Sequence, residues 1–168
     1  MGNIILTGFM GAGKSTVGMR LAERLKMEFV DLDREIEKVT GMSVNQIFKR
    51  YGEIRFRSEE NLMVEKLAKR NGLVIATGGG TVLREENMQI LRNNGIIILL
   101  EASPEDIFAR VSRKRGTRPL LRKNLTIENI EAMLADRDPF YQQADHRINT
   151  SGKDLDTIVK EIMNQCRK

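Results

Sequence analysis

The stretch GFMGAGKS, residues 8–15, limits the possible folds of this chain more than any other feature. It matches the pattern G-x-x-x-x-G-K-[S/T], in which backbone N–H groups of a glycine-rich loop point inward at phosphate oxygens. The apolar run NIILTG precedes it, and a segment with helical periodicity follows from Lys14 to Lys26. A helix that begins at such a loop adds the positive end of its dipole to the site. The sequence therefore predicts a strand, a phosphate-binding loop and a helix, in that order.

Apolar runs of strand length alternate with longer helix-like segments along the chain. We expect strands at residues 3–8, 28–33, 73–77, 96–100 and 146–150, and helices at 14–26, 53–70, 85–92, 125–141 and from 155 onward, with another starting at Ser103-Pro104-Glu105. This alternation is typical of a parallel sheet covered by helices on both faces. A chain of 168 residues fits one domain. The expected fold class is therefore α/β, a three-layer sandwich with a five-stranded parallel sheet spanning residues 1–168.

Unusual residues follow three of the expected strands. Gly8 opens the phosphate loop, Asp31 and Asp33 close the second strand, and residues 78–80 are three consecutive glycines after the third. Ligands of such sheets bind beyond the carboxyl ends of the strands, so we expect these residues along one rim. In strand geometry the two aspartates would point to the same side. They would either serve Mg²⁺ and a substrate hydroxyl, or simply cap a helix from Arg34 onward.

Arg57 and Arg137 are ambiguous when each is taken by itself. Glu53 lies four residues before Arg57 and Glu60 lies three after it, so both carboxylates can meet the guanidinium on one helix face. Such a group is either a surface ion pair or a guanidinium that carboxylates hold in place to grip an anion. Arg137, in the stretch DRDPFY, is equally open.

The net charge of +5 is concentrated in one segment. Residues 107–127 include no Asp or Glu, and their basic residues are Arg110, Arg113, Lys114, Arg115, Arg118, Arg122 and Lys123. The segment is either a solvated helix face or a site for anionic ligands. Apolar runs are far shorter than a membrane span, no signal peptide is evident, and the single cysteine fits a reducing compartment. We therefore expect a cytoplasmic protein with no membrane partner.

The ordered motifs resemble those of the shikimate kinases, small P-loop kinases of the nucleoside-monophosphate-kinase type. The resemblance runs essentially end to end, through GFMGAGKST (8–16), FVDLDREIE (29–37), GEIRFRSEE (52–60), ATGGGTV (76–82), RPLL (118–121) and RDPFY (137–141). It implies ATP-dependent phosphorylation of the 3-hydroxyl of shikimate, which gives shikimate 3-phosphate and ADP on the route to chorismate and the aromatic amino acids.

The resemblance also implies roles for individual residues. Mg²⁺ would be the cofactor, bound directly by Ser15 and through water by Asp31. The catalytic residues would be Lys14, Asp33 and Arg118. The residues in contact with shikimate would be Asp33, Arg57, Gly79, Gly80 and Arg137. The residues in contact with ATP would be Gly11, Ala12, Gly13, Lys14, Ser15, Thr16, Arg110, Arg118 and Lys153.

Three segments gain an interpretation from this resemblance. A helical region of about residues 33–60 would bind shikimate. The basic segment would form a small lid, about residues 112–124, that closes over ATP and excludes water. The glycines at 78–80 would let the ring of shikimate approach bare backbone, and a Cβ at Gly79 would occupy space that the ring needs. The alternative is that these glycines only form a tight turn.

Other classes of P-loop protein would carry different sequence features. A GTPase would carry a guanine-reading N-K-x-D stretch, which this sequence lacks. A gluconate or other small polyol kinase would lack the pair of arginines. A nucleic-acid-binding module is disfavoured because the basic residues are concentrated in one segment and only 5% of residues are aromatic. We expect ATP and shikimate as partners, no nucleic acid, and a monomer, which is typical of the family.

Overall fold

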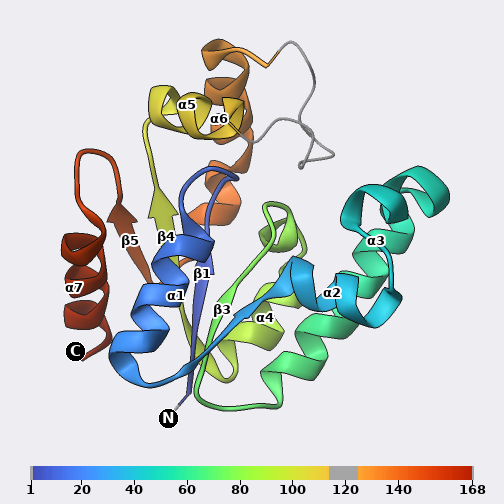
Figure 1. The fold of residues 1–168 in the computed structure, drawn as a ribbon, viewed down its shortest axis with the longest axis horizontal. Helices are drawn as coiled ribbons and strands as arrows, with labels where there is room; N and C mark the ends of the chain where they lie inside the picture. The colour runs from blue at the N-terminus through green and yellow to red at the C-terminus, as the bar shows by residue number, and fades with distance from the viewer. Residues whose placement is uncertain (1, 114–124, 168) are drawn as a thin grey trace.

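Parallel strands form the centre of the computed structural model, which describes residues 2–113 and 125–167 (Figure 1). The strands are β1 (Asn3–Thr7), β2 (Glu28–Asp31), β3 (Leu73–Ala76), β4 (Gly95–Glu101) and β5 (His146–Asn149). They are hydrogen-bonded in the order β2-β3-β1-β4-β5, and every pairing is parallel. The expected five-stranded parallel sheet is confirmed.

Helices connect these strands. They are α1 (Lys14–Leu25), α2 (Leu32–Thr40), α3 (Val44–Ala68), the short 3-10 helix η1 (Thr81–Leu83), α4 (Glu85–Arg92), α5 (Pro104–Ser112), α6 (Ile127–Tyr141) and α7 (Leu155–Cys166). The predicted start of α5 is confirmed, because Ser103 Oγ accepts a hydrogen bond from the Asp106 N–H at 3.1 Å and Pro104 lies in the first turn. Most of the predicted lid, residues 112–124, lies outside the described residues.

The central strand β1 explains why helices cover both faces of the sheet. Ile5 belongs to a core cluster that one face of the sheet shares with α2, α3 and α4. Ile4 and Leu6 belong to a second cluster on the other face, with α1 and α7. Successive side chains of a strand point to opposite faces, so an uninterrupted apolar strand must be covered twice. The three-layer arrangement follows from this pattern and matches the prediction.

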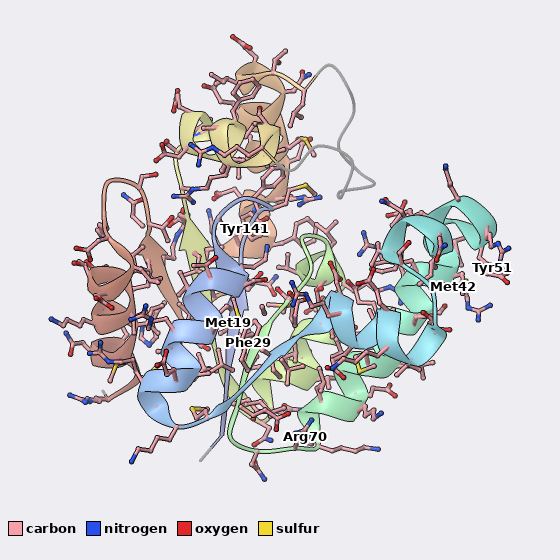
Figure 2. The ribbon with its side chains drawn as sticks, in the orientation of Figure 1. Met19, Phe29, Met42, Tyr51, Arg70 and Tyr141 are labelled. Carbon is pink, nitrogen blue, oxygen red and sulfur yellow. The ribbon has the colours of Figure 1, made fainter. Side chains whose placement is uncertain are left out.

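An arm formed by α2 and the first part of α3 projects beyond the edge of the sheet (Figure 1). Met42 and Tyr51 lie toward its far end, away from the sheet (Figure 2). The backbone of α3 leaves helical geometry at Gly52, with φ 84° and ψ 177°. The helix predicted to begin at Glu53 is therefore the second part of a longer element that begins at Val44, after the Ser43 cap.

Asp31 and Asp33 do not both belong to the second strand, so the prediction that they point to the same side of it is wrong. The second strand ends at Asp31 rather than at Asp33, and Asp33 lies in the first turn of α2. The Asp31 carboxylate caps this helix, because its Oδ1 accepts a hydrogen bond from the Arg34 N–H at 3.3 Å. The two side chains therefore do not share a side of a strand. They nevertheless line the same cavity at the carboxyl end of the sheet.

The register of the sheet brings the loops after β1, β2 and β3 to one rim. Asp31 is level with Ala76, and Ala76 is level with Leu6. Phe9 and Met10, in the loop after β1, also pack in a third apolar cluster with residues of α5 and α6. The predicted meeting of the three loops is confirmed. In the described ranges, no helix is both long enough and apolar enough to cross a membrane.

Candidate active site

The loop between β1 and α1 is shaped to surround an anion. Gly11 and Gly13 have positive φ angles of 84° and 95°, a conformation that residues with a Cβ rarely adopt. Gly13 caps α1 without a side-chain acceptor, which leaves the first N–H groups of the helix for a ligand. Lys14 is buried, and its Nζ donates hydrogen bonds to the carbonyl oxygens of Gly8 and Phe9. The predicted phosphate loop therefore has the expected form.

A cavity of about 370 Å³ opens beside this loop. Its walls combine the loop and the start of α1 with acidic, basic and apolar side chains: residues 10–17, Asp31, Asp33, Thr77, Arg110, Val111, Arg113, Thr150, Leu155 and Ile158. Ligand cavities typically combine apolar walls with a few polar groups that fix the ligand's orientation. A nucleotide has both characters, with an apolar base and charged phosphates, so this cavity suits one.

Ser15 and Asp31 provide a pair of oxygen ligands at this cavity. The Ser15 hydroxyl donates a hydrogen bond to Asp31 Oδ2 at 2.9 Å, while Oδ1 of the same carboxylate accepts from Arg34 N–H. Asp31 thus caps a helix and also faces Ser15, so the two alternatives for this residue are compatible. Among the described residues, no group of three or more His, Cys, Asp or Glu side chains could hold a metal ion. A hydroxyl and one carboxylate fit Mg²⁺, which usually keeps several waters and binds substrate phosphates as well.

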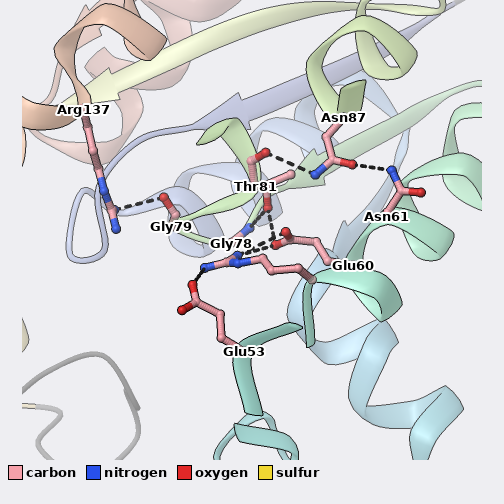
Figure 3. A network of polar contacts seen from close by, with 9 residues as sticks. Glu53, Glu60, Asn61, Gly78, Gly79, Thr81, Asn87 and Arg137 are labelled. Carbon is pink, nitrogen blue, oxygen red and sulfur yellow. Dashed lines mark hydrogen bonds and ion pairs between the residues drawn. The ribbon is translucent and has the colours of Figure 1, made fainter. Parts of the chain in front are cut away.

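Arg57 is part of a largely buried ion pair. Its Nη1 lies 3.1 Å from Glu60 Oε1, and its Nη2 lies 3.4 Å from Glu53 Oε1 (Figure 3). The Arg57 side chain is 13% exposed and the Glu60 side chain 0%, whereas Glu53 is 61% exposed. The predicted meeting of both carboxylates with Arg57 is confirmed. The alternative of a surface ion pair describes only the contact with Glu53.

Arg137 is held by groups that carry no negative charge. Its Nη1 donates a hydrogen bond to the Gly79 carbonyl oxygen at 3.0 Å, and its Cζ lies 5.0 Å from the centroid of the Phe9 ring. Burial raises the pKa of the neighbouring Tyr141 phenol, and Arg137 opposes this shift, so the phenol stays neutral at neutral pH. Within residues 2–113 and 125–167, no carboxylate forms an ion pair with Arg137.

The three consecutive glycines lie against three different side chains. A Cβ at Gly78 would lie 2.7 Å from Asp33 Oδ1, and a Cβ at Gly80 would overlap the guanidinium of Arg57. A Cβ at Gly79 would meet Arg137 Nη1 and Met10 Cε only at an ordinary 3.6 Å. The packing of the protein therefore explains Gly78 and Gly80, because both positions let a polar side chain approach the backbone. At Gly79 the protein itself leaves room for a Cβ, so a contact between this residue and the shikimate ring stays a prediction beside the alternative of a tight turn.

Only some of the remaining residues predicted to contact ATP line the cavity. Arg110 lines the cavity, and its Nη1 donates a hydrogen bond to the Gly11 carbonyl oxygen at 2.8 Å. Thr16 also lines the cavity, whereas Lys153 is not among its lining residues and pairs with Glu161 at 3.0 Å. Arg118 lies outside the described residues.

Sequence reasoning missed three contributors to the site. Phe9 occupies a variable position of the phosphate-loop pattern. Thr81 and Tyr141 stand in the stretches ATGGGTV and RDPFY, but the sequence assigned no role to either. Thr81 Oγ1 donates a hydrogen bond to Glu60 Oε2 at 2.9 Å, across 21 positions of sequence. No local pattern signals such a contact. The one available hint was that Thr81 directly follows the three glycines.

The family model for shikimate kinase matches residues 10–167. A shikimate kinase of Pelotomaculum thermopropionicum is 54% identical over 164 residues, which cover 98% of this chain and 95% of that protein. A shikimate kinase of Geobacter sulfurreducens is 46% identical over 99% of this chain and 91% of its own length.

Solved structures agree with the sequence relatives. The structure of shikimate kinase from Acinetobacter baumannii in complex with shikimate superposes with a TM-score of 0.93 at 37% identity, covering 99% of this chain and 93% of that one. The shikimate kinase of Aquifex aeolicus superposes with a TM-score of 0.82 at 32% identity, covering 98% of this chain and 96% of that one.

Proposed function

We propose how individual residues carry out phosphoryl transfer, on the premise that this chain belongs to the shikimate kinase family. The protein is an ATP:shikimate 3-phosphotransferase, which forms shikimate 3-phosphate and ADP in the biosynthesis of chorismate and the aromatic amino acids. Phosphoryl transfer requires mainly positioning of the reactants and stabilisation of charge on the migrating group. We therefore assign a role to each residue according to the part of ATP, Mg²⁺ or shikimate that it can bind.

The phosphate loop would bind the phosphates of ATP. In this proposal the N–H groups of residues 11–16 bind phosphate oxygens, and Lys14 turns from the loop carbonyls to the outer phosphates. Arg110 or Arg113 would pack on the adenine, since both line the same cavity as the loop. Arg118 of the lid would reach the phosphates during transfer. The assignment of Lys153 to ATP has no support from its ion pair with Glu161.

Ser15 and Asp31 would hold Mg²⁺, Ser15 directly and Asp31 through a water molecule. The support is the 2.9 Å contact between the Ser15 hydroxyl and the Asp31 carboxylate at the edge of the phosphate loop. When bound together with ATP, the ion neutralises charge on the phosphate oxygens. Removal of Mg²⁺ with a chelator should therefore abolish ADP formation.

Asp33, Arg57 and Arg137 would bind shikimate beside the glycine loop. In this proposal Asp33 accepts hydrogen bonds from the ring hydroxyls and takes the proton of the 3-hydroxyl as that oxygen attacks. The guanidinium groups of Arg57 and Arg137 bind the carboxylate, and Gly79 and Gly80 contact the ring. Arginine suits this task because its planar donors match a carboxylate bidentately.

A single observation carries this assignment: all three polar side chains converge on one glycine loop. Asp33 packs against Gly78, Arg137 against Gly79 and Arg57 against Gly80. The three come from α2, α6 and α3, which are separate in sequence. A carboxylate for hydroxyl groups and two guanidinium groups for an anion surround a strip of bare backbone, which suits a compact ring with hydroxyls and one carboxylate.

ADP release by the purified protein with Mg-ATP tests the assignment. Shikimate, quinate, gluconate and no acceptor should be compared, because these separate the ring, the carboxylate and the hydroxyl pattern. We expect turnover with shikimate only. Turnover with gluconate and none with shikimate would overturn the proposed pocket and favour the polyol-kinase alternative.

We further propose that the protein acts in the cytoplasm as a monomer, without nucleic acid. Asp33, Arg57 and Arg137 of the same chain all pack against one glycine loop. The single cysteine, Cys166, is compatible with a reducing compartment. Light scattering on the purified protein should give the mass of one chain, 19.1 kDa.

A further inference from the structure

Thr81 joins the glycine loop to the ion pair that holds Arg57. Its hydroxyl accepts a hydrogen bond from the Gly78 N–H at 3.0 Å and donates one to Glu60 Oε2 at 2.9 Å (Figure 3). Glu60 in turn accepts from Arg57 Nη1, at 3.1 Å through Oε1 and 3.3 Å through Oε2. A continuous set of hydrogen bonds therefore runs from the backbone of the loop to the guanidinium of Arg57.

The main-chain carbonyl of Thr81 is also linked to helix α3, through the side chain of Asn87. Asn87 Nδ2 donates a hydrogen bond to the Thr81 carbonyl oxygen at 3.3 Å, and Asn61 Nδ2 donates to Asn87 Oδ1 at 2.8 Å (Figure 3). Asn61 directly follows Glu60 in α3. The side chain and the backbone of Thr81 are thus both tied to neighbouring residues of one helix, so the loop has little freedom relative to that helix.

Complete burial makes these contacts sensitive to the loss of one hydroxyl. Thr81, Glu60 and Asn87 are each 0% exposed. Water therefore has no access to replace a missing partner of the Gly78 N–H or of the Glu60 carboxylate. Hydrogen bonds to a charged group are also shorter and stronger than neutral ones. The Thr81 hydroxyl is therefore one of the groups that hold the Glu60 carboxylate, and Glu60 in turn binds Arg57.

The close approach of Gly80 to Arg57 explains why this orientation matters. Arg57 lies so near Gly80 that a Cβ there would overlap its guanidinium. A shift of the loop would therefore move the backbone against Arg57, and a shift of Arg57 would open a gap beside the loop. The hydrogen bonds of Thr81 connect the glycine loop to the partner of Arg57.

We propose that Thr81 is a positioning residue for shikimate binding, which fixes Arg57 and the glycine loop at one mutual distance through Glu60. The proposal rests on the proposed role of Arg57 in binding the shikimate carboxylate. Thr81 itself touches neither substrate. Its contribution is to binding remote from the reacting hydroxyl, so it acts on the KM for shikimate more than on kcat.

Steady-state kinetics of Thr81→Val and Thr81→Ser test the proposal. Valine keeps the shape of threonine without the hydroxyl, whereas serine keeps the hydroxyl without the methyl group. We expect Thr81→Val to raise the KM for shikimate about tenfold while the KM for ATP changes less than about twofold. Thr81→Ser should restore the KM for shikimate to within about threefold of the unmodified protein. An unchanged KM for shikimate in Thr81→Val, or equal losses in the valine and serine variants, would overturn the proposal.

Asn3→Ala provides the control for a loss that is merely structural. Asn3 is also buried, and its side chain accepts from the Leu73 N–H at 3.0 Å and donates to the Arg70 carbonyl at 2.9 Å. It lies at the start of β1, whereas the site lies beyond the carboxyl ends of the strands. Asn3→Ala should lower the melting temperature and leave the KM for shikimate unchanged. If it raises that KM as much as Thr81→Val does, Thr81 has no positioning role.

Arg57→Lys separates failure of this proposal from failure of the proposed function. If Arg57→Lys raises the KM for shikimate and Thr81→Val does not, Arg57 keeps its role and Thr81 loses its own. If Arg57→Lys leaves that KM unchanged, both assignments are overturned. In the double variant we expect the two effects on the KM to be less than additive, because Thr81 acts through Arg57.

Discussion

Arg57 and Arg137 are proposed to bind the same carboxylate, yet the protein holds them in different ways. Arg57 lies between the buried carboxylate of Glu60 and the exposed carboxylate of Glu53. Arg137 is held by the Phe9 ring and the Gly79 carbonyl oxygen, and among the described residues it has no acidic partner. Both guanidinium groups are largely buried beside the same glycine loop. Both guanidinium groups are positively charged. Nearby carboxylates offset the charge of Arg57, whereas no carboxylate of the described residues pairs with Arg137.

This difference assigns different tasks to the two side chains. Charges interact more strongly where water is excluded, so an uncompensated guanidinium is a strong attractor for an anion. The charge of Arg57 is already offset, and its contribution is a rigid pair of donors in fixed geometry. We therefore infer that Arg137 supplies most of the attraction for the carboxylate, and that Arg57 mainly orients it.

Replacement of Arg137 should have the largest effect on shikimate binding. Arg137→Ala removes the uncompensated charge, and we expect the KM for shikimate to rise about 100-fold or more, with the KM for ATP nearly unchanged. The stability of the protein should change little, because no buried carboxylate loses its partner. Steady-state kinetics and urea unfolding measure both quantities.

Arg147→Ala is the matched control for this change. Arg147 is also an arginine on the C-terminal side of the chain, but its side chain is 43% exposed and pairs with Glu101 and Asp138. The Arg147→Ala substitution should leave the KM for shikimate unchanged. If Arg57→Ala raises that KM more than Arg137→Ala does, the two tasks are assigned the wrong way round.

Replacement of Arg57 should combine a smaller binding defect with a loss of stability. We expect Arg57→Ala to raise the KM for shikimate about tenfold, because oriented donors are lost while the attraction to Arg137 remains. The free energy of unfolding should fall by about 3 kcal/mol, since Glu60 would stay buried without its cation. Urea unfolding should show partial recovery in Arg57→Ala/Glu60→Gln. If Arg57→Ala alone is as stable as the unmodified protein, the buried ion pair does not determine stability.

Removal of the ring beside Arg137 should have a moderate effect. Phe9→Leu keeps an apolar side chain but abolishes the attraction between the ring face and the guanidinium, about 1 kcal/mol, so the KM for shikimate should rise about fivefold. In the Arg137→Ala background the same change should add nothing further to the KM. A full additional effect in that background would show that Phe9 acts on shikimate binding without Arg137.

Loss of the exposed partner of Arg57 should have the smallest effect. Glu53 is 61% exposed, so its ion pair with Arg57 is well solvated and screened by salt. We expect Glu53→Gln to change the KM for shikimate by less than about twofold. A rise comparable to that of Arg57→Ala would mean that the exposed carboxylate, rather than Glu60, holds the arginine.

The parts of this structure that sequence could predict are those set by local patterns. The phosphate loop, the strands and the cap at Ser103 follow from spacing and residue type over a few positions. The convergence of residues 8–15, 31–33 and 78–80 also followed, because carboxyl ends of parallel strands share a rim. The partners of Arg57 were predictable because Glu53 and Glu60 lie at helical spacing from it.

The parts that sequence reasoning missed depend on tertiary contacts or on competing turn chemistry. The sequence predicts a strand that includes Asp33, at residues 28–33, but the cap at Asp31 starts a helix at Leu32 instead. The complete burial of Glu60 and its hydrogen bond from Thr81, 21 positions away, depend on tertiary packing that no local pattern signals. The contact between Arg137 and the Phe9 ring likewise depends on the fold, which brings these distant residues together.

The central claim is that two guanidinium groups recognise the carboxylate of shikimate, with Arg137 supplying the attraction. The most direct test compares kcat/KM for shikimate with that for its neutral carboxamide, in the unmodified protein and in Arg137→Ala. The account predicts that the unmodified protein prefers the carboxylate by about 1,000-fold, and that Arg137→Ala loses most of this preference. Equal kcat/KM values for the two acceptors in the unmodified protein, or an undiminished preference in Arg137→Ala, would contradict it.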